Sequence, residues 1–189
     1  MLLKIFLFGV AVATSSAADL QRYDYRVLAT NKTSTMEKEM NEAADAGYSF
    51  QAVMGGESAF GGKEVVLVMG KPLGGEIAGN KTYKLLATKK TSTMEKELQE
   101  MGAEGFDYRG QTVFESTFGG REVSVILERD KGTPAKQFQF RLIATSKTST
   151  MQQELQEAGD AGFKLLGMTV GKTAFGGSEL VSILSKEEQ

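Results

Sequence analysis

The sequence predicts an α+β fold made of three tandem β-α-β-β repeats, each a three-stranded sheet in the order 1-3-2 covered by one helix. The first observation behind this prediction is recurrence. Three short motifs return in the same order with a period of about 58 residues, which is typical of a repeat architecture. The second observation is that apolar spacing within each copy changes from strand-like to helix-like and back.

The three motifs locate the copies along the chain. A strand-like motif occupies 25–30, 83–88 and 140–145. A Lys-Thr-Ser-Thr-Met motif follows at 32–36, 90–94 and 147–151, and Phe-Gly-Gly lies at 60–62, 118–120 and 175–177. The repeats are therefore expected at 19–70, 83–128 and 139–189. Glycine, proline and charged residues gather in 71–82 and 129–138, so these two segments are expected to be linkers.

A helix is predicted after the first strand of each copy. Ser34 and Glu37 have the spacing of a capping box, in which both side chains satisfy free backbone N–H groups; Ser92 with Glu95 and Ser149 with Gln152 share that spacing. Apolar residues at i, i+4 and i+7 predict one buried helix face. They are Met36, Met40 and Ala43, then Met94, Leu98 and Met101, then Met151, Leu155 and Ala158. Gly47, Gly105 and Gly162 are expected to end the helices, because glycine adopts the left-handed conformation easily.

The second and third strands are expected to form a hairpin. Tyr48, Phe106 and Phe163 open the second strand, and the Phe-Gly-Gly motif forms the turn. The third strand, at 64–69, 122–127 and 179–184, is the most continuously apolar, so it should be central in the sheet. Strands one and two are then parallel and joined by a right-handed crossover. The pattern leaves open whether the repeats close around a pseudo-threefold axis or lie in a row.

Residues 1–18 are predicted to be a signal peptide. Lys4 gives a short positive start, 5–13 is apolar apart from Gly9, and Ser16-Ala17-Ala18 supplies the small residues that signal peptidase reads. The apolar run is shorter than the roughly 20 residues of a membrane-spanning helix. We therefore expect cleavage before Asp19, an exported protein that is periplasmic or extracellular, and no transmembrane segment after cleavage.

The composition excludes several classes of function. The chain has no cysteine and no histidine, which excludes disulfides, thiolate catalysis and Ser-His-Asp hydrolysis. The formal net charge is −2, so no basic surface for nucleic acid is expected. Paired carboxylates or Ser-Lys chemistry stay open, but an enzyme is disfavoured, and no catalytic residue, metal site or cofactor is predicted.

The middle copy resembles a small bacterial family of unknown function. The resemblance lies in Leu98-Gln99-Glu100-Met101-Gly102-Ala103-Glu104-Gly105-Phe106, followed by Glu-Val-Ser-Val-Ile-Leu at 122–127. Members of that family, domain of unknown function four-one-seven-seven, often read Leu-Asn-Glu-Leu-Gly-Ala-Glu-Gly-Trp there. This chain departs from the family by having Phe106 in place of tryptophan, by its triplication and by its predicted export. The resemblance implies a β-α-β-β fold and brings no activity and no catalytic residues.

The Lys-Thr-Ser segment before each helix is the first candidate binding site, because it is identical in the three copies. Free N–H groups at a helix N-terminus favour anions, and the lysine and hydroxyl groups add charge and donors. The hypothesis is three equivalent sites for phosphate, sulfate or carboxylate groups. They comprise Lys32, Thr33 and Ser34, then Lys90, Thr91 and Ser92, then Lys147, Thr148 and Ser149. The alternative is that serine caps the helix and lysine is solvated.

The phenylalanines of the hairpin turns are the second candidate. Phe60, Phe118 and Phe175 each precede two glycines, and an exposed ring there could anchor a partner protein. The alternative is a turn whose ring folds back onto the core. The recurrent glutamates at 64, 122 and 179 are expected to be solvated, since their spacing brings no two carboxylates together within a repeat.

These observations favour an exported, non-enzymatic binding or scaffolding protein, whose partner is an unknown protein or a small anionic ligand. Triplication of a binding surface suits multivalent contact, in which linked weak sites gain avidity. One alternative is a small-molecule or cofactor carrier, or an enzyme, with its site between repeats. Another is a structural envelope protein that self-assembles through open strand edges, and a homo-oligomer is consistent with either reading.

Overall fold

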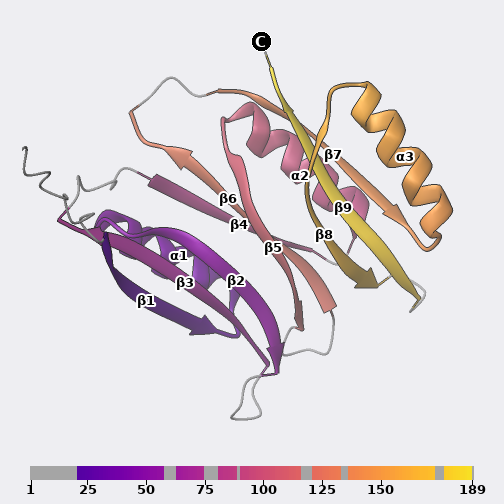
Figure 1. Ribbon diagram of the computed structural model, residues 1–189. Helices are drawn as coiled ribbons and strands as arrows, with labels where there is room; N and C mark the ends of the chain where they lie inside the picture. Colours follow the sequence, from indigo (N-terminus) through magenta and orange to yellow (C-terminus); the bar gives the residue numbers. More distant parts are fainter. Residues whose placement is uncertain are drawn as a thin grey trace, which may run out of the picture.

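The computed structural model describes residues 21–57, 63–74, 81–88, 90–115, 121–132, 136–172 and 177–188. It confirms the predicted α+β fold: each of the three repeats has one helix and one three-stranded sheet (Figure 1). The predicted signal peptide, 1–18, and the hairpin residues Phe60, Phe118 and Phe175 lie outside the described residues.

The order of elements is the same in each repeat. The first repeat contains β1 (Arg22–Thr30), α1 (Thr33–Asp45), β2 (Ser49–Glu57) and β3 (Lys63–Leu73). The second contains β4 (Lys81–Thr88), α2 (Thr91–Ala103), β5 (Asp107–Glu115) and β6 (Arg121–Asp130). The third contains β7 (Phe138–Thr145), α3 (Thr148–Asp160), β8 (Lys164–Lys172) and β9 (Ser178–Glu187).

The third strand of each repeat is central, as predicted. The sheet orders are β1-β3-β2, β4-β6-β5 and β7-β9-β8, and every pairing is antiparallel, so the two outer strands are parallel to each other. The strands are longer than predicted, and β3 enters the expected linker because Arg22 of β1 pairs with Leu73. Pro72 fits there because β2 begins opposite Gly70, which leaves β3 with only one neighbour beyond that point.

The predicted capping boxes are wrong. The N-cap residues of the three helices are Lys32, Lys90 and Lys147. None of the three helices has a side-chain hydrogen bond that caps its N-terminus. Ser34 instead lies within the first turn of α1. The carboxylate of Glu37 cannot serve the N-terminus of its own helix, because it is bound to the next repeat, at the backbone N–H of Leu85.

The helix ends follow the prediction. Gly47, Gly105 and Gly162 have φ of 90°, 86° and 84°. The N–H of Gly47 donates to the carbonyl of Ala44, and the N–H of Tyr48 donates to that of Ala43, which is the Schellman pattern; the other two helices repeat it. The second strands begin one residue after Tyr48, Phe106 and Phe163, so these aromatic residues do not open the strands as predicted. Tyr48 and Phe106 are buried beside the helix ends.

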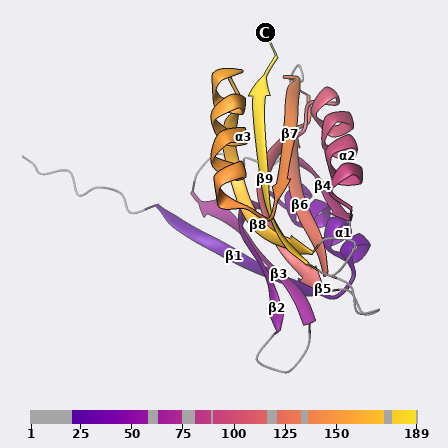
Figure 2. The same ribbon diagram turned by 90° about the vertical axis from the view of Figure 1, so that its right-hand side faces the viewer.

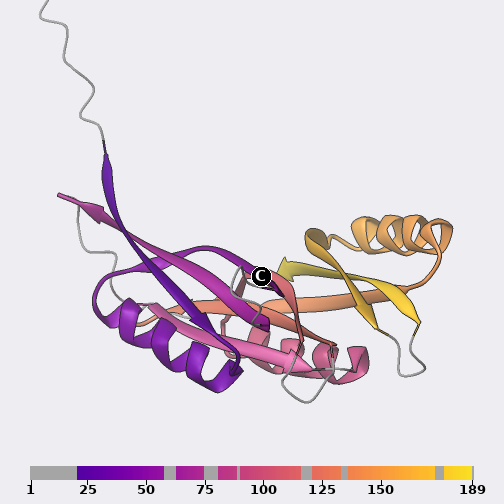
Figure 3. The same ribbon diagram turned by 90° about the horizontal axis from the view of Figure 1, so that it is seen from below.

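The three repeats lie in a row, which answers the question that the sequence left open (Figure 3). The main packing between repeats joins consecutive copies, through α1 with β4, β2 with β5, α2 with β7, and β5 with β8. Figure 2 shows the consequence for the third sheet, which has α3 on one side and α2 on the other. Each of the first two helices therefore covers its own sheet and also the back of the next one.

The hydrophobic core crosses the joints between repeats. The predicted stripe residues Met36, Met40 and Ala43 share a buried cluster with Tyr83 and Ile126 of the second repeat. The cluster beneath α2 likewise contains Phe140, Val181 and Ile183 of the third repeat. A single unit of this size builds only a marginal core, and here the first two cores are completed by the following repeat.

Candidate functional site: the repeat joints and the two end faces

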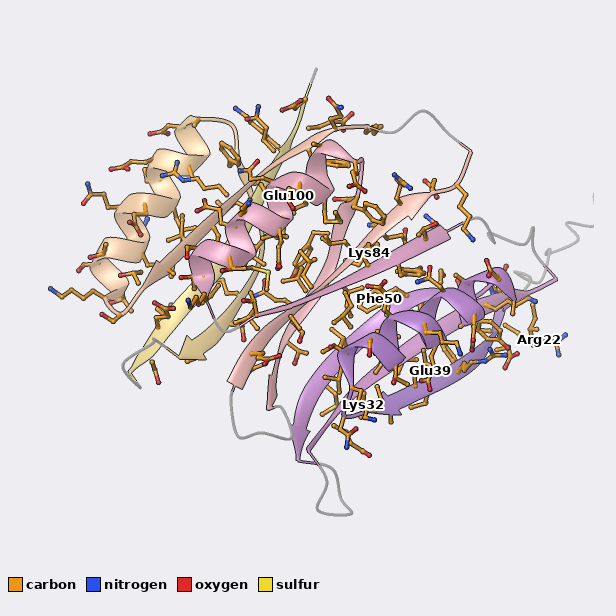
Figure 4. All side chains as sticks on the ribbon, turned by 180° about the vertical axis from the view of Figure 1, so that it is seen from behind. Arg22, Lys32, Glu39, Phe50, Lys84 and Glu100 are labelled. Atoms are coloured by element: carbon orange, nitrogen blue, oxygen red, sulfur yellow. The ribbon has the colours of Figure 1, made fainter. Side chains whose placement is uncertain are left out.

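The first joint covers the open edge of a sheet. Among the described strands β4 pairs with β6 alone, so the N–H and C=O groups on its other edge have no strand partner there. The Asn41 side chain of α1 satisfies both groups of Tyr83: Oδ1 accepts from the N–H at 3.0 Å, and Nδ2 donates to the carbonyl at 3.0 Å. Glu37 Oε2 accepts from the N–H of Leu85 at 3.0 Å. The helix thus takes the place of a fourth strand, alongside β4 (Figure 4).

The spacing of these side chains explains why a helix can cover a strand edge. Glu37 and Asn41 are four residues apart, so they are separated by about 6 Å along the helix axis. Tyr83 and Leu85 are two residues apart on the same edge of β4, which corresponds to about 6.6 Å. The two distances match, so two side chains reach two successive edge positions without distortion.

The second joint repeats the arrangement. Aligning the Lys-Thr-Ser-Thr-Met motifs makes Asn41, Gln99 and Gln156 equivalent. Gln99 donates to the carbonyl of Phe140, and Glu95 Oε1 accepts from the N–H of Leu142 at 3.4 Å. Backbone approach is closest at Gly102, where a Cβ atom would lie 2.1 Å from the carbonyl oxygen of Phe138.

An aromatic side chain of each following repeat fills the apolar part of the joint. Tyr83 and Phe140 are equivalent, and both are fully buried against the preceding repeat. The hydroxyl of Tyr83 accepts a hydrogen bond from the N–H of Phe50 at 2.9 Å. The second strands of neighbouring repeats also meet at glycines. In the first joint a Cβ atom on Gly110 would lie 3.0 Å from the Phe50 ring, and in the second joint one on Gly167 would lie 2.1 Å from the Tyr108 hydroxyl.

A buried carboxylate of the second repeat holds the Tyr83 hydroxyl at the first joint. Glu128 is 5% exposed and bonds to Lys81 at 2.7 Å, to Arg109 at 3.0 Å and to the Tyr83 hydroxyl at 2.6 Å. Burial and the bond to Glu128 raise the pKa of Tyr83 well above its usual range. Burial lowers the pKa of Lys81, but its bonds to Glu128 and Asp130 outweigh that effect and raise it overall. Three partners hold the carboxylate, which indicates a structural role.

The structure places the predicted anion sites at three separate helix N-termini. Lys32, Lys90 and Lys147 are exposed, and no described hydrogen bond or ion pair joins one Lys-Thr-Ser group to another. A crevice beside Lys32 and Thr33 is apolar and too narrow for a water molecule. Anion binding stays a prediction, which isothermal titration with phosphate, sulfate and acetate at low salt checks. Heat at three sites supports it, and the absence of heat contradicts it.

The described residues contain no cluster of three acidic side chains placed to hold a metal ion. No described helix is long and apolar enough to cross a membrane.

Two surfaces that were not among the predicted sites lie at the ends of the row. Large apolar side chains that are exposed among the described residues belong to the first and third repeats. They are Tyr23, Tyr25, Val27, Met54 and Leu73 in the first, and Leu165, Met168 and Val170 in the third. We call Tyr23, Tyr25, Val27 and Met54 the head face. We call Gln152, Gln156 and Gly159 of α3, with Leu165, Met168 and Val170 of β8, the tail face.

The end faces are uncovered copies of the joint surfaces. Tyr25 is equivalent to Tyr83 and Phe140, yet it is 60% exposed where they are 0% and 1% exposed. Gly159 is equivalent to Gly102, yet a Cβ atom on it would meet nothing within 4 Å. A signal for both was present in the sequence, because an amide recurs at 41, 99 and 156 and an aromatic ring at 25, 83 and 140.

Fold and site together define an α+β repeat protein in which helices cover the sheet edges of following repeats. Comparison of the chain with protein-family models, with curated proteins and with solved structures gave no match. The resemblance of the middle copy to the bacterial family therefore stays a prediction.

Proposed function

We propose that this chain is an exported, non-enzymatic scaffolding protein that acts through protein–protein contacts at its head and tail faces. One observation carries the proposal: the exposed large apolar side chains of the described residues gather on the first and third repeats, and the second repeat has none. Contiguous exposed apolar side chains commonly mark interaction surfaces.

The internal joints support a binding role for the ends. The positions exposed at the ends are the ones that pack between repeats elsewhere in the chain: Tyr25 matches Tyr83, and Leu165 matches Phe50. A surface whose equivalents are all buried in protein contacts has the size, shape and polar groups of a protein-binding surface. Its partner is therefore expected to be a protein.

The polar groups of the first joint favour a scaffold over a catalyst. Glu128 is the most deeply buried carboxylate among the described residues, and two cations and a hydroxyl hold it. A general acid or base needs a position from which it can reach a substrate, whereas this carboxylate is buried and is held by three groups of its own repeat. Export is proposed on the signal-peptide pattern of residues 1–18.

Size-exclusion chromatography of gently prepared host extracts tests the function. The wild-type protein is expected in a complex larger than one chain, and a variant that carries both Tyr25→Lys and Gly159→Lys is expected to elute as a single chain. Native mass spectrometry of the mature protein separates the carrier alternative. A small-molecule adduct that leaves on denaturation, together with elution as a single chain in the wild type, contradicts the scaffold proposal.

A further inference from the structure

We propose that the partner of each end face is the opposite end face of a second copy of this chain, so that α3 of one copy covers the free edge of β1 in the next. The inference rests on the proposed function, because it names the occupant of the head and tail faces. The contact continues an interface that the chain already forms twice, between α1 and β4 and between α2 and β7.

The polar part of the joint is present at both ends. β1 pairs only with β3, and no described side chain bonds to the backbone of Tyr25 or Val27. Gln156, in the place of Asn41 and Gln99, reaches the Tyr25 carbonyl of the second copy. Its amide now donates to Asp160 on the exposed surface of α3 at 2.9 Å, a bond that water replaces at little cost.

The second polar contact differs from the internal joints by one group. Gln152 stands where Glu37 and Glu95 accept backbone N–H groups. Its side-chain carbonyl accepts a hydrogen bond as a carboxylate does, so it serves the N–H of Val27. An uncharged acceptor also removes the need to bury a carboxylate between two chains, which is costly without a paired cation.

The apolar part of the joint is also complete. The Tyr25 ring enters the space beside α3 that Tyr83 and Phe140 occupy beside α1 and α2. Phe140 shows that a ring without a hydroxyl group fits this position. Gly159 leaves room for close backbone approach, as Gly102 does against Phe138 in the second joint, and Tyr23 is the residue equivalent to Phe138.

The second strands complete the match. Phe50 and Val53 pack over Gly110 in the first joint, and their equivalents in β8, Leu165 and Met168, are exposed. Ala52 stands in the place of Gly110, so its Cβ atom must be accommodated by the second copy. Leu165 is shorter than Phe50, which leaves space for that atom.

The interface joins two different surfaces, so it does not close on itself in a dimer. Each added copy leaves one head face and one tail face free, and the association continues into an open chain or a closed ring. The copies are related by the same kind of step that relates neighbouring repeats within the chain.

Sedimentation velocity of complementary variants tests the inference on the mature protein, purified from its host and measured up to about 0.1 mM, which detects dissociation constants of that order. Tyr25→Lys blocks the head face, and Gly159→Lys blocks the tail face. Both positions are exposed in the single chain, so melting temperatures that do not fall below that of the wild type show that folding is intact. Tyr25→Phe is the matched control and keeps association, because Phe140 occupies the equivalent place.

The expected result is growth of the wild-type protein with concentration, single chains for each blocked variant alone, and dimers but nothing larger in their equal mixture. A wild-type protein that stays a single chain overturns the inference, as does a blocked variant that still associates alone or a mixture without dimers. The proposed function fails separately. If the variant with both substitutions loses the host complex while the pure wild-type protein stays a single chain, a different protein occupies the end faces. If the host complex survives both substitutions, the scaffold proposal falls too.

Discussion

The side-chain amide of Asn41 forms two hydrogen bonds with the backbone of Tyr83, one to its N–H and one to its carbonyl, both at 3.0 Å. The pair joins the helix of the first repeat to the edge strand of the second. One side chain thus satisfies the two backbone groups that a neighbouring strand would bond in a sheet. It also covers a strand edge that could otherwise pair with another chain.

Replacing Asn41 by alanine is expected to destabilise the protein by about 2 kcal/mol, because a partly buried edge loses both partners at Tyr83. Urea unfolding followed by circular dichroism measures the change. Gln156→Ala is the matched control, since within the described residues the equivalent amide bonds to Asp160 alone, on the surface, and its loss should change the stability of the single chain little. Equal losses in the two variants contradict the role of Asn41 at the joint.

Two equivalent glycines are expected to respond in opposite directions to the same substitution. Gly102→Ala places a Cβ atom 2.1 Å from the Phe138 carbonyl oxygen, so it should force the second joint apart and lower the melting temperature. Gly159→Ala meets open space and should stabilise α3 by about 1 kcal/mol, because alanine favours helix over glycine. Thermal unfolding of both variants checks the pair. A destabilised Gly159→Ala single chain is incompatible with an uncovered tail face.

The buried carboxylate of Glu128 is expected to contribute more to the free energy of unfolding than the exposed carboxylate of Asp130. Glu128→Gln should cost about 3 kcal/mol, because Lys81 and Arg109 lose the charge that compensates them. Asp130→Asn removes only the exposed end of the Lys81 pair and should cost less than about 1 kcal/mol. Chemical denaturation of both variants decides the matter, and similar losses argue against a special role for Glu128.

The stability of the protein is expected to fall at alkaline pH, because the partly buried Tyr108 hydroxyl at the second joint resists losing its proton. Burial raises the pKa of Tyr108 to about 12 from 10.0. The folded state therefore keeps this proton while the unfolded state releases it, so the stabilisation is complete below pH 10 and is lost as the pH rises towards 12. Urea midpoints between pH 9 and 12 measure the fall. Tyr108→Phe should make it shallower, and an unchanged slope contradicts the assignment.

The local features of the fold could be predicted from the sequence. The apolar helix stripes, which are buried except for the half-buried Met101 and Leu155, depend on residues within one repeat, as do the glycine helix ends and the central third strand. Periodicity and glycine conformation decide the outcome there. The capping boxes could not be predicted correctly for the opposite reason. Glu37 has two possible partners, its own helix end or the edge of β4, and only the packing of the next repeat selects the second.

The end faces could not be predicted, because they are recognised only when the burial of equivalent residues is compared between the repeats. Tyr25 and Tyr83 read alike in the sequence, and only burial separates them. The sequence singled out the Lys-Thr-Ser segments because they are identical. The joint residues vary between asparagine and glutamine or tyrosine and phenylalanine, and the contact that Asn41 and Gln99 share is the bond to the carbonyl of the following repeat's aromatic residue.

Amide hydrogen exchange at β1 tests the central claim most directly. The N–H groups of Tyr83 and Leu85 are bonded to Asn41 and Glu37 within the chain, so they should exchange slowly at every concentration. The N–H groups of Tyr25 and Val27 should exchange fast in dilute wild-type protein and slow down as it is concentrated, but not in the Gly159→Lys variant. Fast exchange at Tyr25 and Val27 at every concentration contradicts the claim that the tail face of one copy covers the head face of the next.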